Sequence, residues 1–483
     1  MADIDRREFA GILSAAGLAP ALSAAVPSRL TRAVEAPPNV TRTLAGYVVR
    51  AKPDDIPAPI VAEARRTLVN WVGCALGGAR HETLDHAIAA LQPFSGPQQA
   101  TVLGRAERMD ALTASLMNGM SSHVLDFDDT HLKTVIHPAG PVAPAILALA
   151  EMQPISGRDF LHALILGVEV ECRIGNAVYP AHYDRGWHIT GTAGVFGAAA
   201  ACGKLLGLSE TQMVWALGLA AAQPVGLREM FGSMTKSFHP GRAAQNGFTA
   251  AVLAAKNFTS TDVGLEGKSG WVHVLSTESK WDEITGQLGE RFELRLNTYK
   301  PFACGVVMHP TIDACLQLRE KHRLTADQIE RIDLSVHPLV LELTGKRAPQ
   351  TGLEGKFSIY YAAAIAIVAG GAGPKQFSDA LVRDPVVVAL RDRVTATVTP
   401  GIGEAQVKAA ITLKDGRRLE QSIEQVVGSV ERPMSDADLD RKFLDLADGA
   451  IAVPQARKLL DLCRNIDRLP KAGELASAGG ATG

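Results

Sequence analysis

The sequence contains few aromatic residues and little net charge. Both properties limit the classes of protein that it can encode. Aromatic residues make up 5% of the 483 positions, whereas glycine alone occurs 45 times. A core built from alanine and glycine needs helices that pack closely, so we expect a mainly helical protein. The formal net charge of −2 lacks the basic excess of a general nucleic-acid binder. A local basic pocket for an anionic substrate is compatible with this balance.

Cysteine is also sparse, and its spacing excludes several common uses. The six cysteines form no CxxC pair and match no zinc or iron–sulfur motif. Since several of them lie in apolar helical stretches, we expect free core thiols and not a disulfide framework. The cysteines are Cys74, Cys172, Cys202, Cys304, Cys315 and Cys463.

The amino terminus has the pattern of a targeting signal. Arg6 and Arg7 precede Phe9 and a weakly apolar stretch over residues 12–26. This pattern is typical of a twin-arginine export signal, so we predict a signal and linker over residues 1–36 and a periplasmic protein. The alternative is an amino-terminal arm that stays in place on a cytoplasmic protein. No later apolar run is long enough to span a bilayer, so we expect no membrane association after signal removal.

Residues 41–292 alternate apolar helices with polar loops. Ile60, Ala64 and Leu68 recur every four positions, which indicates one buried helix face. The same spacing elsewhere in this region predicts an all-helical domain. The predicted helices span residues 59–78, 110–124, 141–152, 159–177, 192–206, 209–222 and 242–255.

The pattern changes after residue 292, where branched residues indicate strands. The Lys414–Arg417 segment is typical of a hairpin turn. We therefore predict a smaller α+β domain over residues 293–432, helices over 433–470 that return to the helical domain, and a disordered tail over 471–483. Strands are predicted at 329–336, 394–398, 405–413 and 418–427, and a helix at 356–369.

Three polar loops interrupt the helices, which suggests that they converge on a cleft. The first contains Asp126, Asp128 and Asp129, followed by Thr130 and His137. Three close carboxylates suggest a metal site, but this loop lacks the alternating oxygen ligands and later acid of magnesium and calcium loops. A carboxylate paired with His137 would tune that imidazole as a general base. The alternative is a simple helix cap.

The second loop, residues 186–192, carries His188 directly before a helix. At a helix amino terminus, free N–H groups and the dipole favour a substrate carboxylate. The alternative for a lone histidine is a loop residue with its hydrogen bonds satisfied.

The third loop, residues 232–242, gathers hydroxyls, a lysine, a histidine and an arginine before a helix. This composition suits a carboxylate-binding cradle, whereas the glycine spacing does not fit a P-loop. The alternative is a solvated loop that caps the helix. The candidate residues are Ser233, Thr235, Lys236, His239 and Arg242.

Residues 299–305 join the two predicted domains. Lys300 in this segment would close over a ligand from the other lobe, unless it is an ordinary surface lysine. Cys304 lacks the surrounding motif of a catalytic nucleophile, so we expect it to be a substrate contact at most.

Motifs in a fixed order connect these loops over residues 40–465 and leave the amino terminus uncovered. They are His123-x-x-Asp126-Phe-Asp-Asp-Thr130, His137-Pro138, Gly167-x-Glu169-Val170, Gly186-Trp187-His188, the Met234–Gly247 stretch, Lys300-Pro301-x-x-Cys304 and Lys356-Phe357-Ser358. In these motifs the chain resembles the MmgE/PrpD family, which includes 2-methylcitrate dehydratase, cis-aconitate decarboxylase and iminodisuccinate epimerase.

The resemblance implies a large all-helical domain with a smaller α+β lid, an active site between them, a homodimer, and no metal or organic cofactor. Our hypothesis is that His137, oriented by Asp126, transfers a proton, with His188 as partner acid or second base. Lysines would stabilise the charge that develops on the substrate carboxylate, and Thr130 would hold a substrate oxygen. The implied site residues are Asp126, Thr130, His137, His188, Lys236 and Lys300.

The chemistry so implied is proton abstraction beside a carboxylate of a small di- or tricarboxylic acid. The leading interpretation is a 2-methylcitrate dehydratase-like lyase. An epimerase is the first alternative, because His137 and His188 would supply two bases for one carbon. A cis-aconitate decarboxylase fits less well, since the loop over residues 130–137 is one residue longer and Cys304 replaces a histidine. A non-catalytic tricarboxylate-binding protein is a further alternative.

Overall fold

The computed structural model describes residues 36–481. The predicted export signal around Arg6 and Arg7 lies outside these residues. Within the described range, no helix combines the length and the apolar character that a membrane span requires.

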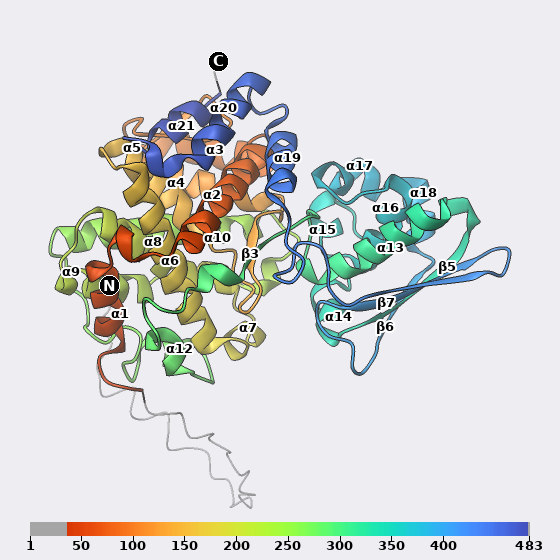
Figure 1. Cartoon of the computed structure of the whole chain (residues 1–483), viewed down its shortest axis with the longest axis horizontal. Helices are drawn as coiled ribbons and strands as arrows, with labels where there is room; N and C mark the ends of the chain where they lie inside the picture. The colour runs from red at the N-terminus through yellow and green to blue at the C-terminus, as the bar shows by residue number, and fades with distance from the viewer. Residues whose placement is uncertain (1–35, 482–483) are drawn as a thin grey trace, which may run out of the picture. The chain divides into compact units, whose positions relative to one another are not determined.

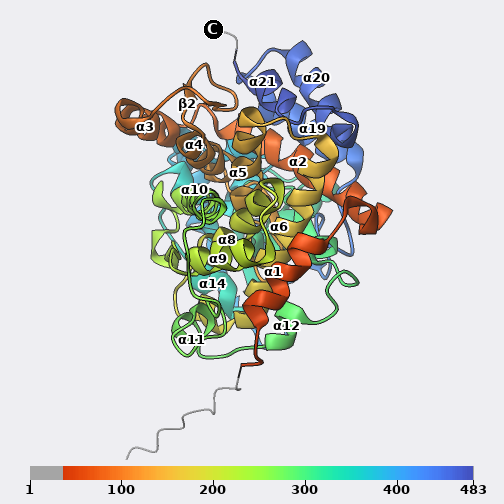
Figure 2. The same ribbon diagram turned by 90° about the vertical axis from the view of Figure 1, so that its left-hand side faces the viewer.

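The larger domain consists of helices that pack around a buried central helix, as Figures 1 and 2 show. Every residue of α8 from Ile189 to Gly203 is buried, so this helix is covered on all sides. Small residues make that packing close: a Cβ added at Gly247 on a neighbouring helix would lie 2.6 Å from the carbonyl oxygen of Val195 in α8. The mainly helical character that the composition predicts is therefore confirmed, and for the predicted reason, although two short two-stranded ribbons also belong to this domain.

Seven helices of this domain match the seven predicted spans to within three residues, except at one start described below, and the other elements were not among the predicted spans. The elements are α1 (Val40–Arg50), α2 (Ala58–Gly78), α3 (Glu82–Leu91), β1 (Ala100–Thr101), β2 (Arg108–Met109), α4 (Ala111–Val124), β3 (Asp129–His131), α5 (Ala139–Met152), α6 (Gly157–Val178), α7 (Ala181–Asp184), α8 (Ile189–Leu205), α9 (Glu210–Ala221), α10 (Thr235–Ala255), α11 (Trp271–Leu275), α12 (Trp281–Thr285) and β4 (Asn297–Tyr299).

One helix boundary differs from the predicted one, and it affects residues of the candidate site. Helix α10 begins at Thr235, seven residues before the predicted start at Arg242, and it contains Pro240. Proline and glycine together predict a break, yet the glycine is needed for packing: a Cβ at Gly241 would lie 2.4 Å from the carbonyl oxygen of Leu116. Lys236 and His239 therefore belong to the first turns of a helix and not to a loop.

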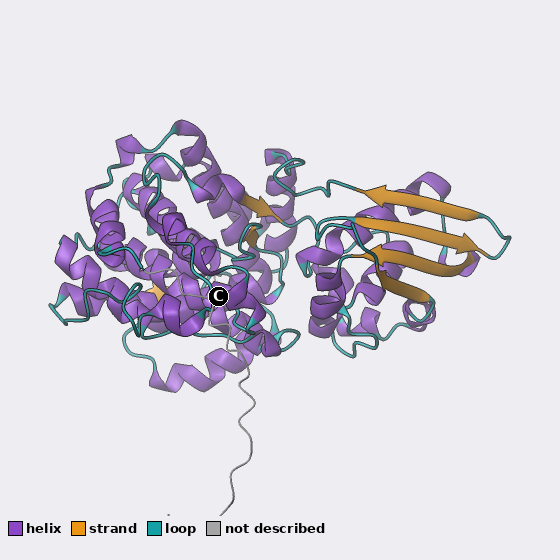
Figure 3. Ribbon diagram, turned by 90° about the horizontal axis from the view of Figure 1, so that it is seen from below, coloured by secondary structure: helices purple, strands orange, loops and turns teal. Residues whose placement is uncertain are grey.

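The smaller domain, the lid, is a four-stranded sheet with helices against one face (Figure 3). The strand order is β6-β5-β7-β8; β5 runs parallel to β6 and antiparallel to β7, and β7 and β8 form the predicted hairpin. Its elements are α13 (His309–His322), β5 (Ile329–Val336), α14 (Pro338–Thr344), α15 (Gly352–Gly355), α16 (Ile359–Ala369), α17 (Asp379–Val382), α18 (Pro385–Arg391), β6 (Val394–Val398), β7 (Val407–Leu413) and β8 (Arg418–Ile423).

After the lid the chain returns to the helical domain as α19 (Asp436–Ala447), α20 (Val453–Arg464) and α21 (Glu474–Gly479). Helix α19 packs against α2, where a Cβ at Gly73 would lie 3.2 Å from Phe443. The predicted disordered tail is wrong for residues 471–481. Leu475 is buried, and the carbonyl of Gly479 accepts a hydrogen bond of 2.8 Å from the Gly104 N–H. The glycines and alanines that suggest disorder are small enough to fit this close contact.

Candidate active site

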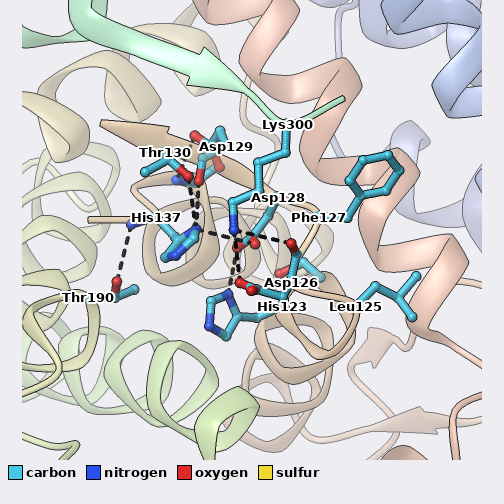
Figure 4. A network of polar contacts seen from close by, with 12 residues as sticks. His123, Leu125, Asp126, Phe127, Asp128, Asp129, Thr130, His137, Thr190 and Lys300 are labelled. Atoms are coloured by element: carbon cyan, nitrogen blue, oxygen red, sulfur yellow. Dashed lines mark hydrogen bonds and ion pairs between the residues drawn. The ribbon is translucent and has the colours of Figure 1, made fainter. Parts of the chain in front are cut away.

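A two-stranded ribbon brings the first polar loop and the inter-domain segment together. Strands β3 and β4 pair antiparallel, with Asp129 opposite Tyr299 and Thr130 opposite Thr298. Asp126 precedes β3 and Lys300 follows β4, so the antiparallel pairing places both residues at the same end of the ribbon (Figure 4). This pairing positions residues that are 174 apart in the sequence within hydrogen-bond distance.

Asp126 is the shared partner of two lysines. Its Oδ1 accepts hydrogen bonds of 2.7 Å from Lys236 Nζ and 2.9 Å from Lys300 Nζ, and all three side chains are buried. Its backbone adopts the left-handed region, with φ 50°, at the turn between α4 and β3. Burial alone would raise the pKa of the Asp126 carboxyl, but the two ammonium groups outweigh burial and hold the pKa below its usual value. The carboxylate is therefore ionised and anchors both cations.

His137 is held in one tautomer by a backbone carbonyl. Its Nδ1 donates to the Asp129 carbonyl oxygen at 2.8 Å, and its backbone N–H donates to Thr190 Oγ1 at 3.2 Å (Figure 4). A carbonyl only accepts, so the Nδ1 atom carries the proton and Nε2 of the neutral ring carries a lone pair. Burial lowers the pKa of His137, although Asp128 opposes this effect. The ring is therefore neutral and able to accept a proton at Nε2.

The carboxylate next to His137 is Asp128 and not Asp126. Asp128 Oδ1 lies 3.3 Å from His137 Nδ1, and its Oδ2 accepts a hydrogen bond of 2.8 Å from His123 Nδ1. The prediction that Asp126 orients His137 is thus wrong, because the turn at Asp126 directs that side chain to the lysines. Asp129, the third acid, accepts from Asn297 and the Ala139 N–H, and burial together with Asp128 raises its pKa to about 7.

His188 is the N-cap residue of α8 and lies opposite His137. The two ring centroids are 6.5 Å apart, and the His123 ring lies 4.7 Å from His137 and 5.8 Å from His188. His188 Nδ1 is 2.9 Å from Nδ1 of His239, which comes from α10. The amino ends of α8 and α10 thus supply a second histidine and a lysine to the same place.

A cavity of about 160 Å³ lies between the helical domain and the lid. This volume is below the roughly 300 Å³ at the lower end for drug-sized ligands, so it suits a small metabolite. The helical domain contributes Asp126, Thr130, His137, His188, Lys236 and Lys300, together with Leu132, Val135, Tyr183 and Phe231. The lid contributes Gly305, Val306, Val307, Leu339, Leu343, Thr344, Phe357, Glu404, Ala405, Val426 and Ser429.

Two further buried lysines flank the site without reaching the cavity. Lys356 Nζ donates to the carbonyls of Leu125 (2.6 Å) and Ala303 (2.7 Å). Lys442 Nζ donates to the carbonyls of Phe127 (2.7 Å) and Lys300 (2.9 Å), 3.7 Å from the Phe127 ring centroid. Each lysine therefore ties the Asp126 loop to the segment around Lys300. Sequence reasoning missed both roles: Lys356 occurs in a quoted motif, but nothing separates Lys442 from a surface helix lysine.

These lysines give the site an excess of positive charge. The ammonium groups of Lys236, Lys300, Lys356 and Lys442 are all buried there. Only two of them contact a carboxylate among the described residues, and they share Asp126. Burial lowers the pKa of Lys356 and of Lys442 to about 8 in each case. At neutral pH the four cations exceed the charge of the nearby acids, which favours an anionic ligand.

Comparison with known proteins matches both domains to one family. Residues 42–284 match the MmgE/PrpD N-terminal domain, and residues 302–468 match the MmgE/PrpD C-terminal domain. The chain belongs to the MmgE/PrpD family. The segment that carries Lys300 lies between the two matched regions.

Relatives that match most of this chain carry the names of lyases or of a lyase-like protein. The chain is 27% identical over 465 residues to the cis-aconitate decarboxylase-like protein oryM of Aspergillus oryzae, covering 90% of this chain and 96% of that protein. It is 26% identical to human cis-aconitate decarboxylase, covering 89% and 92%. Identity to the 2-methylcitrate dehydratase of Cupriavidus necator is 22%, covering 70% and 73%.

Five residues predicted to bind substrate do not line the cavity of this MmgE/PrpD protein. Arg242 and Thr235 are exposed, and Ser233 is exposed with its hydroxyl donated to the Met230 carbonyl at 2.7 Å. His239 lies behind His188, and Cys304 is fully buried beside the cavity, where burial raises the pKa of its thiol. The helix that begins at Thr235 explains Arg242 and Thr235, because it turns those two side chains away from Lys236.

The acidic loop also contains a group that could hold a metal ion. The ligand atoms of His123, Asp126, Asp128 and His137 lie within 4.8 Å of one another. However, Asp126 Oδ1 is occupied by two ammonium groups, and Asp128 Oδ2 is occupied by the His123 Nδ1–H. A divalent cation would share this site with Lys236 and Lys300, and mutual repulsion opposes that arrangement. The donor set therefore fits a metal poorly.

A larger cavity of about 700 Å³ lies on the other side of the Asp126 loop, between α19 and the lid. Its lining includes Phe127, Lys442, Asp445 and Asp448 but no histidine. Because Lys442 is already bound to two carbonyls, this cavity offers no evident proton-transfer chemistry. The smaller cavity is the better candidate for the active site.

Proposed function

We propose that this protein is a metal-independent lyase that transfers a proton at the carbon beside a carboxylate of a small di- or tricarboxylic acid. The observation that carries the proposal is the pairing, across one small cavity, of a neutral His137 with the Lys236 and Lys300 ammonium groups. The base and the charge stabilisers for such a reaction are thus present together.

The charge around the cavity supports a substrate with more than one carboxylate. One N–H of Lys236 goes to Asp126, so this ammonium group keeps further donors for a ligand. No side chain caps the amino end of α8, and the positive end of the helix dipole there favours anions. Proton removal places negative charge on the substrate carboxylate, and the buried cations stabilise it more strongly than water would.

The reaction that follows proton transfer has two main candidates. A dehydration like that of 2-methylcitrate dehydratase expels water after the proton is removed. A decarboxylation like that of cis-aconitate decarboxylase loses carbon dioxide and then needs a proton donor at carbon. The higher identity and coverage of the decarboxylase relatives favour the second candidate, whereas Cys304 and the longer loop favour the first.

Solvent deuterium incorporation separates these reactions. The full chain is incubated in deuterated buffer with 2-methylcitrate, citrate, cis-aconitate, itaconate or iminodisuccinate and followed by proton NMR. We expect exchange at a carbon beside a carboxylate, together with an alkene, with loss of carbon dioxide, or with a stereoisomer in the case of an epimerase. No exchange with any acid, combined with thermal stabilisation by one of them, would instead indicate a tricarboxylate-binding protein.

A further inference from the structure

His188 and His239 form a hydrogen-bonded pair that extends from the cavity into the protein. Their Nδ1 atoms lie 2.9 Å apart, and the two residues are 2% and 3% exposed. His188 lines the cavity, whereas His239 is one layer behind it and packs against His188 with ring centroids 5.1 Å apart. Only the first ring can touch a substrate, so the second acts through the first.

The surrounding backbone fixes this pair in place. The His188 N–H donates to the Gly226 carbonyl at 3.0 Å. Gly226 has φ 114°, and a Cβ there would lie 2.9 Å from the His239 ring and 3.2 Å from the His188 Cβ. Glycine at 226 is therefore required both by its backbone conformation and by the space that the two rings fill.

A hydrogen bond between two Nδ1 atoms needs one proton, and either ring can carry it. If His239 carries it, His188 accepts at Nδ1 and has its own proton at Nε2, facing the cavity as an acid. If His188 carries it, the His188 Nε2 atom bears a lone pair and faces the cavity as a base. Burial lowers the pKa of both rings, that of His239 to about 4, so both are neutral and these two states are the relevant ones.

His137 does not have this freedom. Its Nδ1 proton is donated to the Asp129 carbonyl, which cannot return one. The two histidines that face the cavity therefore differ: His137 is fixed as a base, and His188 can exchange its tautomer with His239.

We propose that His239 is a positioning residue that sets the tautomer of His188, so that His188 acts first as an acid and then as a base within one turnover. This inference rests on the proposed proton-transfer function. In the acid step, His188 gives its Nε2 proton to the substrate carbon while its Nδ1 takes the shared proton from His239. Water gives a proton to His239 Nε2 and leaves as hydroxide, so neither ring becomes an anion. In the reverse direction each proton retraces the same path.

The test compares His239→Asn with His239→Asp, two variants of nearly the same size. Both place polar atoms where Nδ1 of His239 lies. The amide can accept or donate, so either His188 tautomer keeps a partner; the ionised carboxylate only accepts, and holds His188 with its proton on Nδ1. His162→Asn is the control, because His162 is buried in α6 outside this cavity.

We expect kcat of His239→Asn to fall by about tenfold, because the amide serves either His188 tautomer but cannot pass a proton to Nδ1, which must then come from water. We expect kcat of His239→Asp to fall further, by about a hundredfold or more at neutral pH. KM should change less than about threefold in both, because neither variant alters a cavity-lining side chain. Activity of His239→Asp should recover as the pH falls, since the introduced carboxyl then gains a proton to donate. Equal kcat values for the two variants, or a loss that does not depend on pH, would overturn the inference.

A second measurement reads the tautomer directly and does not depend on turnover. Nitrogen NMR of protein labelled with ¹⁵N-histidine should find both His188 tautomers in the wild type and the Nδ1–H form alone in His239→Asp. The same tautomer population in both proteins would overturn the inference. A wild type that exchanges no substrate proton would instead contradict the proposed function, which keeps the two failures distinct.

Discussion

The two walls of the cavity differ in kind. The helical-domain wall carries the histidines and lysines, namely His137, His188, Lys236 and Lys300. Most lid residues that face them are apolar, such as Val306, Leu339 and Leu343, although the lid also contributes Glu404. An apolar cover excludes water and so strengthens the electrostatic interactions beneath it. We infer a division of labour in which the helical wall performs proton transfer and the lid wall selects the substrate by shape.

The largest expected effect comes from removing the base on the helical wall. In His137→Asn the side-chain amide can still donate to the Asp129 carbonyl, so the loop keeps its hydrogen bond while the Nε2 lone pair is lost. We expect deuterium exchange into substrate to fall by about 10² to 10⁴-fold. His162→Asn again controls for placing an asparagine in a buried position. Deuterium exchange by His137→Asn within tenfold of the wild type would show that another residue is the base.

A change in the lid wall should alter selectivity more than chemistry. Leu343→Ala removes apolar volume from the cavity, whereas Leu341→Ala makes the same change in the same helix outside the cavity. We expect the ratio of kcat/KM for a larger acid over a smaller acid to rise by about ten- to a hundredfold in Leu343→Ala and to stay constant in Leu341→Ala. Equal kcat/KM ratios in both variants would show that the lid does not select substrates by shape.

The pH dependence of substrate binding tests the two flanking lysines. Lys356 and Lys442 have pKa values of about 8, so raising the pH through 8 should remove their charges and raise KM for a tricarboxylate by several-fold to about tenfold. Stability should change in the opposite direction. The unfolded lysines titrate near 10.5, so the unfolded chain binds more protons between pH 8 and 10.5, and the free energy of unfolding should rise with pH there.

The paired variants Lys356→Met and Lys442→Met provide the comparison for this prediction. Each methionine variant should have a higher KM than the wild type at pH 7, and its KM should rise less than that of the wild type above pH 8. Lys356→Arg and Lys442→Arg keep the charge and should keep the low KM above pH 8 as well, provided that thermal unfolding confirms their fold. A KM that rises equally in the wild type and in all four variants would assign the titration to other groups.

Metal removal should have the smallest effect. Since Asp126 is already bound by two ammonium groups, we expect dialysis against a chelator to leave deuterium exchange unchanged within error. A loss that added zinc or magnesium restores would show that the group of His123, Asp126, Asp128 and His137 binds a metal after all.

Much of the fold could be predicted because apolar periodicity is a local signal. Residues 329–336 and 394–398 form their predicted strands with the same bounds. The predictions that failed did so because contacts between distant parts of the chain decided the local structure. Pro240 and Gly241 suggest a break, but close packing against α4 needs glycine there. The last residues look unstructured in composition, yet Gly479 fits where a Cβ would lie 2.5 Å from Leu103.

The sequence predicted which loops form the candidate site better than it predicted which side chains contact each other there. Polar residues between apolar helices identify Asp126, His137, His188 and Lys236 as residues that converge. Three neighbouring acids cannot be told apart from sequence, because the left-handed turn at Asp126 decides which carboxylate faces which partner. Lys442 was missed because a long-range backbone contact leaves no pattern near it in the sequence.

The bond from Lys442 to the carbonyl of Lys300 has a consequence for how this architecture can diversify. The chain enters the lid just after Lys300 and has left it by α19, so one ammonium group ties the entry to the exit. A segment whose two ends meet in this way is an insertion with adjacent joints, which can be exchanged as a unit. A lid from another member of the family, grafted between residues 301 and 433, would bring a new substrate-facing wall to an inherited set of acids and bases. Substrate range and reaction chemistry can therefore evolve on separate parts of one chain.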